Sequence, residues 1–404
     1  MSAPPLAITA TTTTTATGAG NAALLDALRT RTSGLRVDTF AERATGVALD
    51  TWSGEVEGLD TPLPESWAAF DCRSNRLAWD ALHRDGFADA VRASVARHGP
   101  ARIALLLGTS TSTFAASEAA YRDATTLDEL ANPRLHHLHA TTDFVQRVLG
   151  LEGPCMTVST ACSSSAKVFG QAARLIAAGL VDAAVVGGVD TLTASTLFGF
   201  RSLGLVSRDL CRPFDARRDG LNIGEAAGFA LLERPDLRDD VPLLVGHGES
   251  SDAHHMSAPH PDGRGARQAI DAALRSASLA PSSVDYINLH GTATRQNDAV
   301  EACAVRALFP ATTRASSTKG WTGHTLGAAG IVEAVVTLIA MREGIAFGTV
   351  NSEAGDPSCG PQILFEHESR SVGIALSNAF AFGGNNCVLA FARDADAWRR
   401  ARRP

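Results

Sequence analysis

Apolar positions along the chain fall into two kinds of segment that alternate. Short, continuous apolar runs at 102–108, 182–188 and 284–289 have the length and composition of strands buried on both faces. Between them lie longer stretches rich in alanine and other small residues, which favour helices. The alternation predicts an α/β protein whose sheet is covered by helices on both faces.

The N-terminal segment has a pattern of its own. Residues 6–17 form a threonine-rich, β-branched run that ends near Gly18 and Gly20, as expected for a strand followed by a glycine turn. Asn21 is a suitable N-cap for a helix over 22–31. The first predicted elements are therefore a strand, a tight turn and a helix.

Two pairs of segments repeat along the chain. The stretch 157–167 reads T-V-S-T-A-C-S-S-S-A-K and resembles 315–330, which reads A-S-S-T-K-G-W-T-G-H-T-L-G-A-A-G. A second pair consists of Gly224–Glu233 and Gly384–Ala392. Such self-similarity predicts two related α/β halves, which we place at 1–240 and 241–404. The first half carries a candidate nucleophilic cysteine, and the second carries two candidate histidines.

Composition and charge narrow the class of protein. The 404 residues are 45% hydrophobic and 20% charged, which is typical of a soluble globular protein. A net charge of −7 argues against broad nucleic-acid binding, and no apolar run approaches the ~18 residues that a membrane helix needs. Residues 1–20 lack the features of a secretory signal. Seven scattered cysteines without a C-x-x-C pair indicate reduced thiols in a cytoplasmic protein, with neither disulfides nor a metal site.

Cys162 has the sequence context of a reactive thiol. It follows a predicted strand at 155–160 and a tight turn at Ala161, and it opens a small-residue helix at about 163–178. A thiol at a helix N-terminus meets free N–H groups and the positive end of the helix dipole, so we expect its pKa to be lowered. An inert, packed cysteine is the alternative, and we keep that interpretation for the cysteines without this context.

Two histidines of the second half lie in glycine-containing loops. His290 stands at the C-terminal end of a predicted strand, where binding residues gather in α/β sheets, and His324 precedes a helix of small residues. Taken singly, each is more often a structural histidine than a catalytic one. Lys319 is either a solvated loop residue or, if it is buried beside the thiol, paired or functional; Glu333 is the candidate partner.

Five motifs in this sequence resemble those of the elongating β-ketoacyl-[acyl-carrier-protein] synthases, a family with the thiolase-like fold. Any one of them is weak, but all five occur in the family's order between about Leu6 and Ala392. They are T-A-C-S-S-S at 160–165, R-P-F-D-A-R-R-D-G at 212–220, H-G-T-A-T at 290–294, S-T-K-G-W-T-G-H-T-L-G-A-A-G at 317–330 and N-A-F-A-F-G-G-N-N at 378–386.

The resemblance implies a five-layered αβαβα fold and a Cys-His-His site of Cys162, His290 and His324, supported by Lys319 and Glu333. It implies decarboxylative Claisen condensation of a cysteine-bound acyl chain with malonyl-[acyl-carrier protein], which gives a β-ketoacyl product. The implied partners are an acyl carrier protein and a second ketosynthase-like subunit, in a homodimer or a heterodimer. No cofactor is implied beyond the carrier's phosphopantetheine arm.

Further roles follow from the same resemblance. The backbone N–H groups of Cys162 and Phe382 are the expected oxyanion hole, and Phe382 with Gly383 and Gly384 forms the expected gate. Candidate acyl-pocket residues are Leu197, Phe198, Phe200 and Phe380, with core packing as the alternative. Arg73 and Arg76 are candidate carrier-docking residues, with solvated surface arginines as the alternative.

Several positions depart from the family pattern. Arg295 and Asn297 stand where proline and glycine are common, G-E-G-A becomes G-E-A-A at 224–227, and S-F-G-F-G-G-T-N becomes A-F-A-F-G-G-N-N. These changes leave the catalytic side chains in place. With these departures the sequence resembles the ketosynthases of bacterial aryl-polyene pathways. Both fatty acid synthesis and aryl-polyene-like synthesis therefore remain open as the pathway of this protein.

Rival functions are separated by single residues. A thiolase would need a second catalytic cysteine in the last glycine loop, and residues 380–386 contain none. Chain-initiating synthases have asparagine where this chain has His324. The remaining alternative is a non-catalytic or weakly catalytic chain-length subunit, which would lose the cysteine, whereas this chain keeps Cys162.

Overall fold

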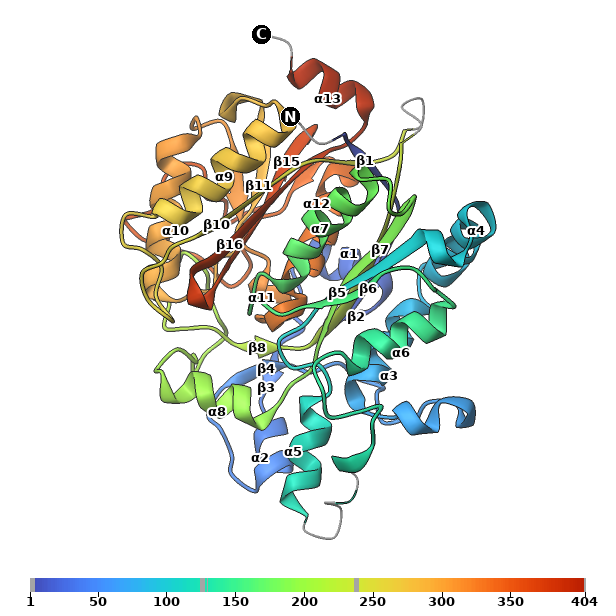
Figure 1. The fold of residues 1–404 in the computed structure, drawn as a ribbon. Coiled ribbons are helices and arrows are strands. Elements are labelled where there is room, and N and C mark those ends of the chain that lie inside the picture. Colours follow the sequence, from blue (N-terminus) through green and yellow to red (C-terminus); the bar gives the residue numbers. More distant parts are fainter. Residues whose placement is uncertain (1–3, 124–127, 129, 236–239, 403–404) are drawn as a thin grey trace.

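The computed structural model describes residues 4–123, 128, 130–235 and 240–402, and an 11-stranded mixed sheet runs through it (Figure 1). The predicted strands are present, with bounds that shift by a few residues. The ten strands along the path of the sheet are β1 (Leu6–Thr15), β5 (Ile103–Gly108), β6 (Cys155–Val158), β7 (Ala183–Asp190), β9 (Ala226–Glu233), β10 (Leu243–Ser251), β11 (Tyr286–Asn288), β12 (Arg314–Ser316), β15 (Ile374–Ala381) and β16 (Asn385–Ala392).

The two halves of this sheet have the same strand order. It runs β6-β5-β7-β9-β1 in the first half and β12-β11-β15-β16-β10 in the second. The halves meet where β1 and β10 pair at Leu6↔Leu244 and Ala7↔Leu243. The repeated segments around Gly224–Glu233 and Gly384–Ala392 become the equivalent strands β9 and β16, so the prediction of two related halves is confirmed. A division at residue 240 stays a prediction, and 236–239 lie outside the described residues.

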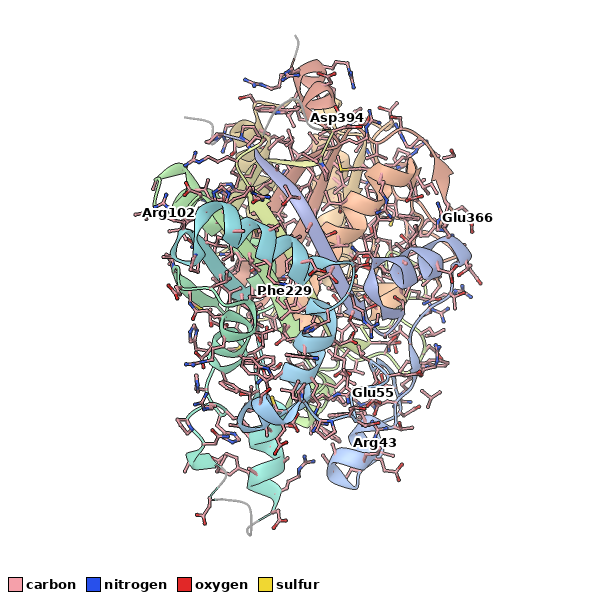
Figure 2. All side chains as sticks on the ribbon, turned by 90° about the vertical axis from the view of Figure 1, so that its right-hand side faces the viewer. Arg43, Glu55, Arg102, Phe229, Glu366 and Asp394 are labelled. Carbon is pink, nitrogen blue, oxygen red and sulfur yellow. The ribbon has the colours of Figure 1, made fainter. Side chains whose placement is uncertain are left out.

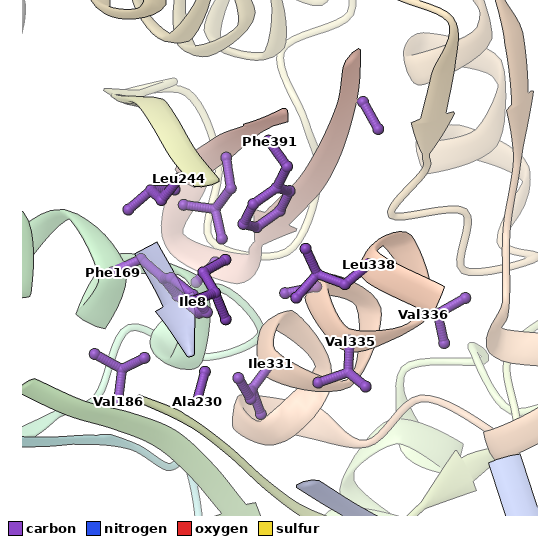
Figure 3. Packing of buried hydrophobic residues seen from close by; sticks show 14 of the residues in the cluster. Ile8, Phe169, Val186, Ala230, Leu244, Ile331, Val335, Val336, Leu338 and Phe391 are labelled. Atoms are coloured by element: carbon purple, nitrogen blue, oxygen red, sulfur yellow. The ribbon is translucent and has the colours of Figure 1, made fainter. Parts of the chain in front are cut away.

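Two helices form the middle layer of the molecule. α7 (Ser164–Ala177) packs on β5 and β7, and α12 (Ala329–Glu343) packs on β11 and β15 and against α7. In Figure 1 they lie side by side between the strands of the two halves, and Figure 3 shows Ile331 of α12 beside Ala230 of β9 in the same hydrophobic cluster. α12 is buried from Ala329 to Met341, and Glu333 is the one carboxylate within this buried stretch, so it must be paired.

Further helices cover the two outer faces. α3 (Arg73–Leu82), α4 (Phe87–His98) and α6 (Ala140–Leu149) cover the first half, and Figure 2 shows Phe229 beneath this helical layer. α9 (Arg264–Ala277), α10 (Arg295–Leu308) and α13 (Ala395–Ala401) pack into the core of the second half. The result is a five-layered αβαβα architecture, as the family resemblance implied.

The remaining elements connect these layers or extend them. None of the helices among the described residues combines the length and the apolar character needed to cross a bilayer. The smaller elements are β2 (Gly18–Ala19), α1 (Gly20–Thr30), β3 (Arg36–Val37), α2 (Phe40–Thr45), β4 (Trp52–Gly54), α5 (Phe114–Arg122), α8 (Ala194–Ser202), β8 (Ile223–Gly224), α11 (Lys319–Thr322), β13 (Ile345–Ala346) and β14 (Glu368–Ser369).

One local prediction was wrong. The first helix begins at Gly20, with Ala19 rather than Asn21 in the capping position. The Asn21 side-chain amide instead donates to the carbonyl oxygen of Thr11 at 2.8 Å. A tertiary contact with β1 therefore replaces the local capping bond that the sequence suggested.

Candidate active site

Cys162 lies on a tight turn between β6 and α7. Ala161 adopts a left-handed backbone conformation with φ 51°, which costs a non-glycine residue energy and bends the chain sharply. Ser163 and Ser164 close the turn, since their hydroxyls donate to the carbonyl oxygens of Thr160 and Ala161 at 3.0 and 2.6 Å. The turn holds Cys162 two residues ahead of the helix, with its side chain in a cavity.

His324 contacts this cysteine directly, although it comes from the other half of the chain. Its Nε2 atom lies 3.1 Å from the Cys162 sulfur, and its Nδ1 atom accepts a hydrogen bond from the Leu326 amide at 3.1 Å. Because a backbone N–H can only donate, Nδ1 is an acceptor and the ring proton is on Nε2. His324 therefore presents an N–H donor to the sulfur.

His290 is held by the predicted lysine. The Lys319 ammonium donates to the carbonyl oxygen and to Nδ1 of His290, the latter at 3.3 Å, and it forms a buried ion pair with Glu333. These three acceptors match the three N–H donors of an ammonium group. Since Nδ1 of His290 accepts, its Nε2 also carries the proton and is a second donor at the site. Lys319 and Glu333 are thus buried partners, as the sequence analysis considered.

The three side chains converge on one point. The Cys162 sulfur and one ring nitrogen from each of His290 and His324 all lie within 4.8 Å of one another. The centroids of the two imidazole rings are 5.4 Å apart. A metal ion would need the Nε2 lone pairs, whereas the Nδ1 contacts of both rings leave N–H groups at those positions. The arrangement fits a negatively charged oxygen better than a cation.

Burial changes the titration of all three groups. Desolvation raises the pKa of the Cys162 thiol to about 11, although Lys319 and the N–H groups of Phe382 and Cys162 oppose this rise. The expectation of a lowered thiol pKa is therefore wrong for this site: the sulfur precedes the helix and loses more from leaving water than it gains. Desolvation, with Lys319 nearby, lowers the pKa of both histidines well below 6.5, so both rings are neutral at pH 7.

A second glycine turn completes the surroundings of the sulfur. The Phe382 amide contacts the Cys162 sulfur, and Gly383 and Gly384 follow with φ of 77° and 70°. Both values lie in the left-handed region that favours glycine. The Gly383 amide donates to the carbonyl oxygen of Met256 at 2.7 Å, which anchors the turn. The geometry thus places Phe382, the first of the three predicted gate residues, next to the cysteine.

A cavity of about 270 Å³ opens onto these groups. Its walls include Phe200, Phe380 and Phe382, and the rings of Phe200 and Phe382 stack with centroids 5.4 Å apart. Leu197 and Phe198, both on α8, are not among the cavity-lining residues and belong to a neighbouring hydrophobic cluster that Phe200 also contacts. Two of the four predicted pocket residues therefore line the cavity, and the other two pack in the core beside it.

The two candidate docking arginines are occupied by internal partners. The guanidinium group of Arg73 binds the fully buried Glu225 through two N–H groups, with Nε at 3.0 Å. Arg76 forms a two-point contact with Asp71 at 2.8 and 2.5 Å. A carrier protein would have to compete with these carboxylates, so the docking role remains a prediction with little support from this geometry.

Sequence reasoning missed two carboxylates near the site. Glu301 accepts hydrogen bonds from the backbone amides of His290 and Gly291 at 2.9 and 2.8 Å, and Asp190 accepts one from Gly327 at 2.6 Å. Both carboxylates are buried. The sequence signals were an acidic residue between Val300 and Ala302 for Glu301 and an acidic residue at the end of an apolar strand for Asp190, and neither pattern is specific.

Comparison with known proteins agrees with this fold and shows the family. Residues 65–237 match the family "Beta-ketoacyl synthase, N-terminal domain", and residues 242–353 match "Beta-ketoacyl synthase, C-terminal domain". The mitochondrial 3-oxoacyl-[acyl-carrier-protein] synthase of Arabidopsis thaliana is 40% identical over 263 residues, which are 60% of this chain and 57% of that protein. The curated relatives are thus matched over less than two thirds of their length.

Solved structures cover nearly the whole chain. A ketosynthase (ApeO) from Xenorhabdus doucetiae, determined in complex with its chain length factor (ApeC), is 36% identical with a TM-score of 0.86, over 96% of this chain and 98% of that one. A β-ketoacyl synthase from Burkholderia phymatum is 28% identical with a TM-score of 0.85, over 97% and 100%. This chain belongs to the β-ketoacyl synthase family.

Proposed function

We propose that this chain catalyses the decarboxylative condensation of an acyl chain on Cys162 with malonyl-[acyl-carrier protein]. The observation that carries the proposal is the convergence of one thiol and two imidazole Nε2–H donors in one cavity. Family membership supports it, because the named relatives are 3-oxoacyl-[acyl-carrier-protein] synthases and ketosynthases.

The first step is transfer of the acyl group. The Cys162 sulfur attacks the acyl thioester, and the N–H groups of Cys162 and Phe382 stabilise the negative oxygen that forms. The carrier thiolate leaves as the new carbon–sulfur bond is made, and it takes the proton that the Cys162 thiol gives up. No net proton is exchanged in this half-reaction.

The second step uses the two histidines. The thioester oxygen of malonyl-carrier accepts from Nε2–H of His290 and His324, and this stabilises the enolate that forms when carbon dioxide leaves. The enolate carbon attacks the acyl group on Cys162, the carbon–sulfur bond breaks, and the thiolate of Cys162 is released. Taking up one proton returns Cys162 to its resting thiol.

The partners and pathway are part of the same proposal. An acyl carrier protein brings both substrates on its phosphopantetheine arm, and a chain-length subunit is the proposed dimer partner, since the ketosynthase from Xenorhabdus doucetiae was solved with such a factor. We place the reaction in fatty acid or aryl-polyene-like synthesis in the cytoplasm, which seven free cysteines support. Condensation assays with saturated, enoyl and aryl-enoyl carrier thioesters separate these pathways.

Mass spectrometry tests the central proposal. The protein is incubated with acyl-carrier protein, and the acyl mass is expected on the peptide that contains Cys162 and on no peptide of the Cys162→Ala variant. The Cys303→Ala variant, which lacks an exposed thiol, is the matched control and is expected to acylate normally. Absence of acylation, or labelling at another residue, would refute the proposed role of Cys162.

A further inference from the structure

The buried carboxylate of Asp190 accepts a hydrogen bond from the backbone amide of Gly327, three residues after His324. Asp190 is the last residue of β7 and is fully buried. It accepts hydrogen bonds from Thr109 Oγ1 at 2.6 Å, the Ser110 amide at 2.9 Å, and the amide and hydroxyl of Thr111, each at 2.8 Å. A fifth bond, at 2.6 Å, comes from the Gly327 amide.

All five of these donors are neutral groups. Burying a carboxylate costs free energy, which its hydrogen bonds to these hydroxyls and amides offset. The bonds join two segments from opposite halves of the chain, namely the loop after β5 and the turn after His324. Asp190 therefore fixes the position of the second segment relative to the first.

The turn that Asp190 holds is conformationally strained. Leu326 has φ 54°, a left-handed conformation that is uncommon for a leucine. The amides of Leu326 and Gly327 are consecutive and have different acceptors, which are Nδ1 of His324 and the carboxylate of Asp190. A β-carbon on Gly327 would lie 2.7 Å from that carboxylate, so the close approach requires glycine.

We propose that Asp190 is a positioning residue for His324. By holding the Gly327 amide, Asp190 keeps the Leu326 turn in its strained conformation, and the Leu326 amide then keeps Nδ1 of His324 as an acceptor. The ring proton stays on Nε2, where it donates to the developing oxyanion. This inference rests on the proposed function, in which His324 serves the decarboxylation step.

The test is the Asp190→Asn variant. The asparagine side chain replaces one acceptor oxygen with an NH₂ group, which cannot accept hydrogen bonds from the surrounding N–H and O–H donors. Acylation of Cys162 is expected to stay within about twofold of the unaltered protein, while malonyl decarboxylation falls by about tenfold or more. Thr111→Val is the matched control, because it removes one hydroxyl bond to the same carboxylate and leaves the Gly327 bond. It is expected to keep both half-reactions at their normal rates.

A second measurement does not depend on turnover. Nitrogen-15 NMR of labelled histidine, assigned with His324→Gln, is expected to show the proton on Nε2 of His324 in the unaltered protein. In Asp190→Asn we expect a mixture of the two tautomers. A proton on Nδ1 in the unaltered protein would overturn the inference, even if the variant does not fold.

Two further outcomes are decisive. Equal losses of acylation and decarboxylation in Asp190→Asn, or no loss of either, would refute the positioning role. If the unaltered protein carried out neither half-reaction, the proposed function would fail, and the tautomer measurement would still decide whether Asp190 positions His324.

Discussion

The Nε2 atom of His324 lies 3.1 Å from the sulfur of Cys162, although 161 residues separate them along the chain. The contact exists because α7 and α12 pack against each other in the middle layer. Each helix follows a turn that carries one of the two side chains. The repeated architecture thus brings a thiol from one half against an N–H donor from the other.

The two steps of the proposed reaction make different demands on His324. We expect His324→Ala to keep acylation of Cys162, because the N–H groups of Cys162 and Phe382 serve that step. Malonyl decarboxylation is expected to fall by about 10²-fold or more, as is typical when one oxyanion donor is removed. Separate assays of acyl-enzyme and carbon dioxide measure the two steps. Normal condensation by this variant would refute the assigned role.

The raised pKa of Cys162 predicts an unusual pH dependence of its reactivity. Only the thiolate reacts with iodoacetamide, and a pKa of about 11 keeps Cys162 mostly protonated at neutral pH. Alkylation of the Cys162 peptide is therefore expected to accelerate about tenfold per pH unit from about pH 7 to about pH 10. Peptide mass spectrometry measures this rate. A plateau below about pH 9 would instead support the thiolate that the helix N-terminus suggested.

The buried pair of Lys319 and Glu333 predicts a large loss of stability. Lys319→Met leaves the Glu333 carboxyl group without its partner, so we expect the free energy of unfolding to fall by about 3 kcal/mol. Decarboxylation is also expected to fall, because Nδ1 of His290 loses the donor that fixes its tautomer. Urea unfolding and carbon dioxide release measure the two effects.

A double variant separates these two effects. Lys319→Met combined with Glu333→Leu removes both buried polar groups, and we expect it to recover much of the lost stability. It should not recover decarboxylation, since Nδ1 of His290 still lacks its donor. Recovery of full activity in the double variant would show that Lys319 has only a structural role.

Arg73 offers a test of the docking prediction. Because its guanidinium group binds the buried Glu225, we expect Arg73→Gln to lower the free energy of unfolding by about 2 kcal/mol. The control is Arg275→Gln on the exposed surface of α9, which should change little. Carrier KM is expected to stay the same in both. Unchanged stability with a raised carrier KM for Arg73→Gln alone would restore the docking role.

Local patterns in the sequence determined the elements and the reactive turns. Apolar runs and small-residue helices predicted the α/β class, and the repeated segments predicted two related halves, because hydrophobic periodicity and turn residues act within a few positions. The motifs around Cys162, His290 and His324 also identified the family. These inferences needed no knowledge of which distant segments pack together.

Only the tertiary structure decided how each charged or titratable group is surrounded. Burial raised the pKa of the Cys162 thiol, whereas the local helix context had suggested a lowered pKa. Arg73, a candidate docking residue in the sequence, binds the buried Glu225 in the structure. The same holds for Asp190, whose five donors come from segments far apart in the chain. Desolvation and hydrogen bonding depend on neighbours in space, so the sequence determined the parts of the site and the packing determined their chemistry.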